Sequence, residues 1–137
     1  HEELIVINPD YSSKDEVIDG LTNMLIDGGF VNGKFLLDVY RREAMGSTLV
    51  KETVAIPHGT PENTIRPAIA VCILKKPILW WAEQEAEIVF LLALKGDAKQ
   101  SMMNLYKVIE DVEFLQKLKK FNDVAYIKSA IIEKSLK

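Results

Sequence analysis

The longest apolar run in the chain is Ile88-Val89-Phe90-Leu91-Leu92-Ala93-Leu94, and this run decides the class of fold. A second run of the same kind, Ile69-Ala70-Val71-Cys72-Ile73-Leu74, precedes it. Both runs are short and lack helical spacing, so each predicts a β-strand. Because apolar residues stand at successive positions, both faces of these strands must be covered. The two runs therefore predict a sheet with helices on either side.

Two further segments near the N-terminus fit such a sheet. The short β-branched run at 4–7 predicts a first strand, and Asn8-Pro9-Asp10 is a turn signal that closes it. Ser13 and Glu16 then have the spacing of a capping box, and an apolar stripe at helical spacing follows. This first helix is expected to end at the glycine pair 28–29.

The remaining segments complete an α/β architecture. Asn32 is expected to cap a second helix that ends at Gly46, and Val54-Ala55-Ile56 predicts another buried strand. Three helical stripes follow the strands, the last of them capped by Asn122 or Asp123. The order of elements predicts a mixed β-sheet sandwiched between helices and disagrees with the strict alternation of a doubly wound nucleotide fold.

Composition limits the classes of function. At 137 residues, with 48% apolar and 27% charged residues and no linker or repeat, residues 1–137 are expected to form one domain. The start at His1 suggests a processed chain, a tag remnant or a domain cut from a longer protein. A net charge of −3 disfavours contact with nucleic acid, and no apolar run is long enough to insert into a membrane. With Cys72 as the single cysteine, we expect a cytoplasmic protein without disulfides.

His58 is the candidate for chemistry. It stands in Ile56-Pro57-His58-Gly59, directly after a predicted strand, where the proline fixes the backbone and the glycine permits a sharp turn beside the imidazole. With one internal histidine and one cysteine, we expect no metal site, and without a Gly-rich phosphate loop we expect no nucleotide cofactor. An imidazole at a strand end can act as base, nucleophile or phosphoryl acceptor. The alternative is a histidine that only bonds the backbone of its own turn.

Other candidates are weaker when taken singly. Arg41 and Arg42 end the second helix and could bind phosphate oxygens, although charged residues at a helix end are usually solvated. Ser47 and Thr48 could donate hydrogen bonds to a phosphoryl group or belong to an ordinary turn. Trp80-Trp81 could stack on bases, but adjacent aromatic residues without a basic stripe favour closure of a core or an edge.

Residues 42–48, Arg-Glu-Ala-Met-Gly-Ser-Thr, and residues 53–60, Thr-Val-Ala-Ile-Pro-His-Gly-Thr, closely resemble a known active-site region. The family is the fructose/mannitol-type enzyme IIA of the bacterial phosphoenolpyruvate-dependent sugar phosphotransferase system. The similarity continues through residues 65–71, 76–80 and 89–93. The sequences of residues 76–80 and 89–93 resemble most the IIA-like domains at the C-terminus of transcriptional regulators and antiterminators of sugar operons. The resemblance implies the enzyme IIA mannitol/fructose-type fold.

The resemblance also implies roles for individual residues. His58 would accept a phosphoryl group from the phosphocarrier protein HPr and pass it to a IIB domain, with Nε2 as the phosphorylated nitrogen. Arg42 would bind the phosphoryl oxygens, with Thr48 and Ser47 as secondary ligands. Transfer of this kind needs positioning and charge stabilisation, and the family requires no nucleotide, metal or other cofactor.

One departure from the family changes the expected function. Transport-type members carry a second active-site histidine after the last core strand, and Ser101 takes that position here, with Gln100 as the alternative. Neither side chain can become cationic to offset phosphoryl charge. This favours a regulatory module attached to other domains of a transcriptional regulator and phosphorylated by HPr or IIB. A transport subunit and a phosphate-free interaction domain are the alternatives, and the sequence names no sugar.

Overall fold

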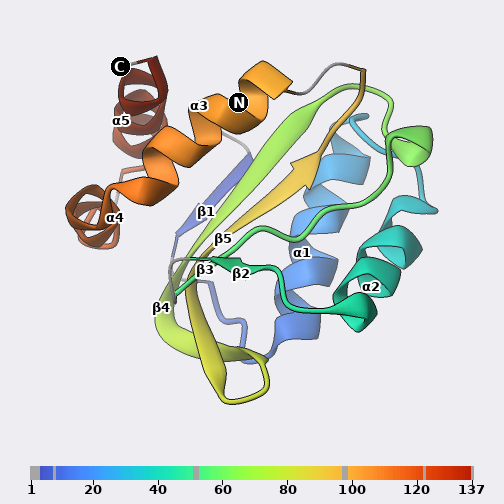
Figure 1. The fold of residues 1–137 in the computed structure, drawn as a ribbon, viewed down its shortest axis with the longest axis horizontal. Helices are drawn as coiled ribbons and strands as arrows, with labels where there is room; N and C mark the ends of the chain where they lie inside the picture. The colour runs from blue at the N-terminus through green and yellow to red at the C-terminus, as the bar shows by residue number, and fades with distance from the viewer. Residues whose placement is uncertain (1–3, 8, 51–52, 97–98, 122, 137) are drawn as a thin grey trace.

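The computed structural model has a five-stranded mixed sheet at its centre (Figure 1). It describes residues 4–7, 9–50, 53–96, 99–121 and 123–136. The strands are β1 (Ile5–Ile7), β2 (Leu49–Val50), β3 (Val54–Ala55), β4 (Ala68–Trp81) and β5 (Gln84–Ala93). Their order across the sheet is β1-β4-β5-β3-β2. The central pair β4–β5 is antiparallel, whereas β1 and β3 pair in parallel with β4 and β5, respectively.

Helices cover both faces of this sheet (Figure 1). The helical segments are α1 (Lys14–Asp27), α2 (Phe35–Met45), the short 3-10 helix η2 (Pro61–Asn63), α3 (Lys99–Glu110), α4 (Val112–Leu118) and α5 (Val124–Leu136). Helices α1 and α2 lie on one face, and α3, α4 and α5 lie on the other (Figure 1). The predicted mixed sheet between helices is therefore confirmed.

The burial of β4 and β5 explains why their sequences are apolar at successive positions. On β4, Ala70 and Cys72 pack into the core beneath α1 and α2, whereas Val71 and Ile73 pack into the core beneath α3, α4 and α5. Each of these side chains is buried. Burial also raises the pKa of the Cys72 thiol to about 12, so this residue belongs to the core, as the sequence predicts.

Some predicted element boundaries are wrong. Strand β4 continues to Trp81, and its last residues alternate between buried and exposed, because the sheet is covered on one face there. The two-residue strand β2 is too short to leave a sequence pattern. Asn32 does not cap α2: its side-chain oxygen accepts a hydrogen bond from the Lys34 amide at 2.9 Å, and the helix begins after Lys34.

The other predicted caps have mixed outcomes. The Ser13 hydroxyl accepts a hydrogen bond from the Glu16 amide at 3.2 Å, as predicted. The Glu16 carboxylate returns to the amide of Ser12 and not to that of Ser13. Asp123 caps the last helix by accepting from the Ala125 amide at 2.9 Å. Asn8 and Asn122 lie outside the described residues.

Asp38 on α2 holds the segment that follows β3. One carboxylate oxygen, Oδ2, accepts a hydrogen bond from the Thr60 hydroxyl at 2.6 Å and a second from the Asn63 amide. Asn63 in turn accepts a hydrogen bond from Asn32 at 3.0 Å. The hydrogen bonds from Thr60 and Asn63 lower the pKa of Asp38. The helix is thus tied to the loop that carries the candidate histidine.

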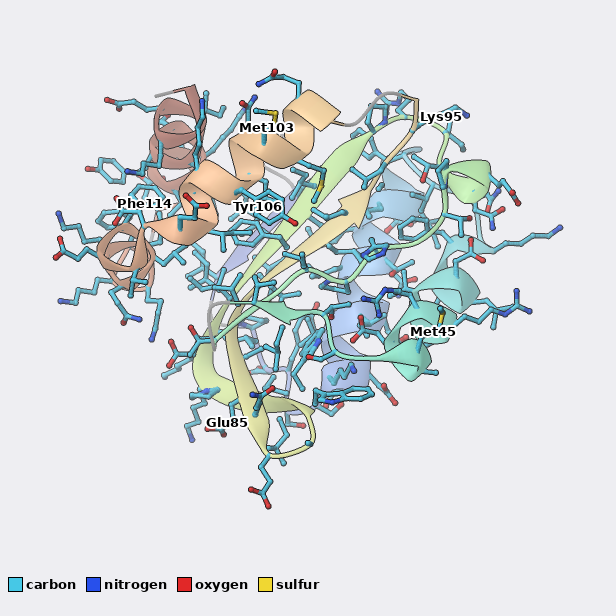
Figure 2. The ribbon with its side chains drawn as sticks, viewed as in Figure 1. Met45, Glu85, Lys95, Met103, Tyr106 and Phe114 are labelled. Atoms are coloured by element: carbon cyan, nitrogen blue, oxygen red, sulfur yellow. The ribbon has the colours of Figure 1, made fainter. Side chains whose placement is uncertain are left out.

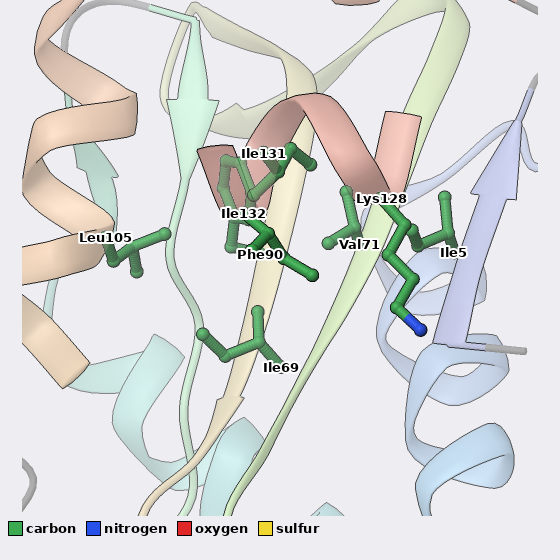
Figure 3. A pocket seen from close by; sticks show the side chains of 8 residues that line it. All are labelled: Ile5, Ile69, Val71, Phe90, Leu105, Lys128, Ile131 and Ile132. Carbon is green, nitrogen blue, oxygen red and sulfur yellow. The ribbon is translucent and has the colours of Figure 1, made fainter. Parts of the chain in front are cut away.

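A small apolar pocket lies between the sheet and the C-terminal helices (Figure 3). Its volume is about 130 Å³, and Lys128 is the one charged residue among those that line it. Val71 of β4 and Ile131 of α5 point into it from opposite layers (Figure 3). The lining residues are Ile5, Ile69, Val71, Phe90, Leu105, Lys128, Ile131 and Ile132.

We expect Asp38→Asn to lower the free energy of unfolding at pH 7 by about 1 kcal/mol, because charged acceptors make stronger hydrogen bonds than neutral ones. The folded-state pKa lies below the unfolded value, so this stability is present above the unfolded pKa and is lost as pH falls through the folded pKa. Urea titrations at pH 7 and at about pH 2.5 measure the difference. Exposed Asp10 supplies the control variant Asp10→Asn, and a difference independent of pH would contradict this account.

We expect Val71→Ile to raise the free energy of unfolding by about 0.5–1 kcal/mol, because the added methyl group enters the apolar pocket. Val89→Ile is the matched control. Val89 is fully buried on the opposite face of the sheet, where the same methyl group overpacks the core and costs about 1–3 kcal/mol. Equal destabilisation of both variants in denaturant titrations would show that the pocket cannot receive the methyl group.

Candidate active site

The backbone around His58 is attached to the central strand β5. Beyond the last residue of β3, the pairing with β5 continues as an isolated bridge between His58 and Leu92. The Leu92 amide donates a hydrogen bond to the Pro57 carbonyl at 2.9 Å. Since Leu92 is buried in the middle of the protein, His58 stands on a rigid support at the edge of the core.

The imidazole of His58 is oriented by its own turn. Nδ1 lies 3.2 Å from the carbonyl oxygen of Ile56. A carbonyl oxygen can only accept a hydrogen bond, so this contact places a proton on Nδ1 and, in the neutral ring, leaves the lone pair on Nε2. The sequence left two interpretations open, a backbone-bonded histidine and a reactive one. The structure accommodates both, because the two functions fall on different nitrogens of one ring.

Gly59 is needed for packing and not for a special backbone angle. Its backbone lies outside the left-handed region, so the sharp turn expected from the sequence does not explain it. A Cβ atom at this position would lie 2.6 Å from Cδ2 of Phe35, which is fully buried on α2. The close approach of Gly59 to this ring lets the loop that carries His58 lie flat against α2.

His58 opens onto a pocket of about 340 Å³ between α2 and the segment after β3. Its lining residues are Asp38, Arg41, Arg42, Met45, His58, Gly59, Thr60 and Pro61. Met45 is 82% exposed and projects from the end of α2 at the rim (Figure 2). The lining contains two guanidinium groups and one carboxylate, so its net positive charge favours an anion.

Arg42 is placed in this pocket by the end of its helix. Its Nη1 donates a hydrogen bond to the carbonyl oxygen of Gly46 at 3.1 Å, a carbonyl that the end of α2 would otherwise leave unpaired. This bond uses one of the five N–H donors of a guanidinium. The structure therefore brings Arg42 and His58 together, and the arginine retains donors that suit phosphoryl oxygens.

Ser47 and Thr48 are placed differently. Neither is among the described residues that line the pocket. The Ser47 hydroxyl accepts a hydrogen bond from the Leu49 amide at 3.0 Å. Thr48 is buried, and its hydroxyl donates to Glu43 Oε2 at 2.7 Å and accepts from Trp80 Nε1 at 3.0 Å. The one proton of the Thr48 hydroxyl is thus already used, and buried Trp80 closes a core as the sequence favours.

Ser101 and Gln100 lie in the first turn of α3, after the last core strand. The side chain of Ser101 lies outside the described residues. Gln100 is exposed, and its Nε2 donates a hydrogen bond to Asn104 at 2.9 Å. Gln100 does not line the pocket around His58, so the described contacts give it no part in the site.

Glu43 is a site-adjacent residue that the sequence reasoning missed. It is only 5% exposed, although it is acidic, and it pairs with Lys14 at 2.8 Å. A signal was available, because Phe35, Val39 and Glu43 follow one another at intervals of four residues along α2. That spacing places the carboxylate on the same buried stripe as the two apolar side chains.

The described residues also bear on a metal site and on a membrane-spanning helix. No cluster of three or more histidine, cysteine or acidic side chains in this part of the chain is arranged to hold a metal ion. Within the same residues, no helix combines the length and apolar character needed to cross a membrane.

Comparison with known proteins gives a family. Residues 1–134 match the model of the family described as phosphoenolpyruvate-dependent sugar phosphotransferase system, EIIA 2. The probable licABCH operon regulator of Bacillus subtilis (strain 168) is 33% identical over 111 residues, which cover 81% of this chain and 17% of that protein. The mannitol-specific phosphotransferase enzyme IIA component of the same organism is 28% identical over 133 residues, covering 92% and 93% of the two chains.

A solved structure gives the same fold. The complex of enzyme IIAMTL and phosphorylated enzyme IIBMTL from Escherichia coli contains a chain that superposes with a TM-score of 0.86 at 20% identity. The alignment covers 96% of this chain and 95% of that one. The expected enzyme IIA mannitol-type fold and the resemblance of residues 42–60 to this family are therefore confirmed. By its match over nearly its whole length, the chain belongs to the EIIA 2 family of the phosphoenolpyruvate-dependent sugar phosphotransferase system.

Proposed function

We propose that this chain is a phosphohistidine domain in which Nε2 of His58 accepts a phosphoryl group from HPr or a IIB domain. One observation carries the proposal: the contact of Nδ1 with the Ile56 carbonyl leaves the lone pair on Nε2, in a pocket that also holds Arg42. Lone pair and guanidinium are the nucleophile and the charge-stabilising group that phosphoryl transfer needs.

In the proposed reaction, the Nε2–P bond of His58 forms in line as the bond between phosphorus and the donor breaks. The bonding electrons stay with the donor. The proton on Nδ1 is not transferred, and its hydrogen bond to the Ile56 carbonyl holds the ring in the plane required for attack. The guanidinium of Arg42 donates hydrogen bonds to the phosphoryl oxygens and offsets their negative charge. Because Arg42 supplies this charge stabilisation, the proposed reaction needs no nucleotide or metal cofactor.

A regulatory role is the version of this function that we favour. It is supported by the 33% identity over 111 residues to an operon regulator, of which this chain spans 17%. Serine in place of the second histidine, at position 101, supports it too, because a neutral hydroxyl offsets less phosphoryl charge than an imidazolium. In this role the domain acts in the cytoplasm, and the added phosphoryl charge alters its contacts with other domains of a regulator.

A transport role is the alternative, and a specific observation supports it as well. The mannitol-specific enzyme IIA component matches along 93% of its own length. The Escherichia coli IIAMTL relative forms a complex with phosphorylated IIBMTL, which supports a IIB protein as the partner here. The two roles predict different fates for the phosphoryl group, rapid discharge onto IIB for transport and slow discharge for regulation.

We expect incubation with phosphoenolpyruvate, enzyme I and HPr, or with a phosphorylated IIB protein, to add the mass of one phosphoryl group. The gain is expected to be acid-labile and absent from His58→Ala. Intact-protein mass spectrometry measures it, and circular dichroism confirms that the variant is folded. An equal gain in His58→Ala, or none in the wild-type protein with either donor, would overturn the assignment. Discharge onto candidate IIB proteins within seconds would select the transport role.

We expect Arg42→Gln to slow phosphorylation of His58 on the order of a hundredfold, because it removes the cation beside the phosphoryl oxygens. Quench-flow or gel-shift time courses measure the rate. Arg66→Gln is the matched control, since Arg66 lies on the surface away from this pocket and donates to the Gly28 carbonyl at 2.8 Å. Rates that fall equally in both variants would rule out a specific role of Arg42.

A further inference from the structure

Four polar side chains from separate elements form a closed ring next to the candidate site. Lys14 Nζ pairs with Glu43 Oε1 at 2.8 Å, and the Thr48 hydroxyl donates to Glu43 Oε2 at 2.7 Å. Trp80 Nε1 donates to the Thr48 oxygen at 3.0 Å, and the Trp80 carbonyl accepts from Lys14 Nζ at 3.0 Å. We call these residues the Glu43 ring. It joins α1, α2, β4 and the turn before β2.

Three of the four residues of the Glu43 ring are buried. Glu43, Thr48 and Trp80 are 5%, 3% and 3% exposed. The Lys14 ammonium also lies 5.2 Å from the centre of the Trp80 ring, within range of a cation–π interaction. A buried carboxylate is costly unless it is paired. Here Oε2 accepts the Thr48 hydrogen bond, whereas Oε1 has the ion pair with Lys14 and no hydrogen bond among the described residues. Replacing one partner therefore leaves a buried group unsatisfied and disturbs the others.

A continuous series of backbone contacts leads from this ring to the imidazole. The Thr48 carbonyl accepts a hydrogen bond from the Ile56 amide at 2.9 Å. The carbonyl of the same residue, Ile56, contacts His58 Nδ1 at 3.2 Å. On the other side, Gly46, two residues before Thr48, accepts the hydrogen bond that places Arg42. Thr48 is thus linked through the backbone both to His58, by way of Ile56, and to Arg42, by way of Gly46.

We propose that the Glu43 ring positions the phosphoryl-acceptor site by fixing Thr48. Through the Thr48 and Ile56 carbonyls, the ring keeps the proton of His58 on Nδ1 and the lone pair on Nε2. Through the turn at Gly46, it holds Arg42 in the pocket that His58 also lines. The effect on transfer rate rests on the proposed function, whereas the effect on the imidazole does not.

A purely structural role makes a different prediction. If the ring only attaches α1 and α2 to β4, its loss would lower the free energy of unfolding and leave the imidazole unchanged in the folded protein. The position of the ring proton distinguishes the two roles, because global stability does not determine which nitrogen carries it. Two-bond ¹H–¹⁵N correlation spectra of ¹⁵N-histidine-labelled protein report that position, with His58→Ala used to assign the signal.

The decisive variant is Thr48→Val, which keeps the shape of the side chain and removes its hydroxyl. We expect a shift of His58 from the Nδ1–H tautomer toward a mixture of both tautomers, and phosphorylation by HPr at least tenfold slower. Thr48→Ser retains the hydroxyl and is expected to rescue both properties. Trp80→Phe removes one hydrogen bond of the ring and is expected to have a smaller effect in the same direction.

Thr22→Val is the matched control. Thr22 is fully buried in α1, and its hydroxyl has no hydrogen-bond partner among the described residues, so the same substitution should alter neither property. Should Thr48→Val fail to fold, Trp80→Phe carries the test. Unchanged tautomer and rate in the folded ring variants would overturn the proposal. A changed tautomer in a protein that neither donor phosphorylates would support the ring and overturn the proposed function.

Discussion

The backbone pairing between the segment after β3 and the central strand β5 is the constraint on which the site depends. It continues past the end of β3, where the Leu92 amide bonds the Pro57 carbonyl and His58 bridges to Leu92. Because residues 88–93 of β5 are buried on both faces of the sheet, this support cannot move without opening the core. The backbone of His58 is therefore fixed to the sheet, and the contact of Nδ1 with the Ile56 carbonyl determines which ring nitrogen is free.

Helix α2 positions Arg42 and is attached to the loop that carries His58. Asp38 ties the helix to the loop after His58, Phe35 lies against Gly59, and Arg42 closes the end of the helix through Gly46. The arginine and the histidine therefore come from elements that are joined at several points along their length. Joining the elements in this way preorganises the two side chains, and preorganisation lowers the reorganisation that transfer requires.

The sequence predicted the parts of this structure that burial dictates. Successive apolar residues such as Val71 and Cys72 indicated a sheet covered on both faces, and the resemblance of residues 42–60 pointed to His58 and Arg42. Burial of Glu43 could have been predicted from its spacing to Val39. The contact of the Thr48 hydroxyl with Trp80 could not, because it joins residues far apart in sequence and depends on where the end of the β4–β5 hairpin lies.

The central claim is that Nε2 of His58 is the nucleophile because Nδ1 is held by the Ile56 carbonyl. Phosphorus-coupled ¹⁵N spectra of the phosphorylated, ¹⁵N-histidine-labelled domain identify the modified nitrogen directly. This account predicts coupling between phosphorus and Nε2, with the proton retained on Nδ1. Coupling to Nδ1, or phosphorylation of another residue, would contradict it.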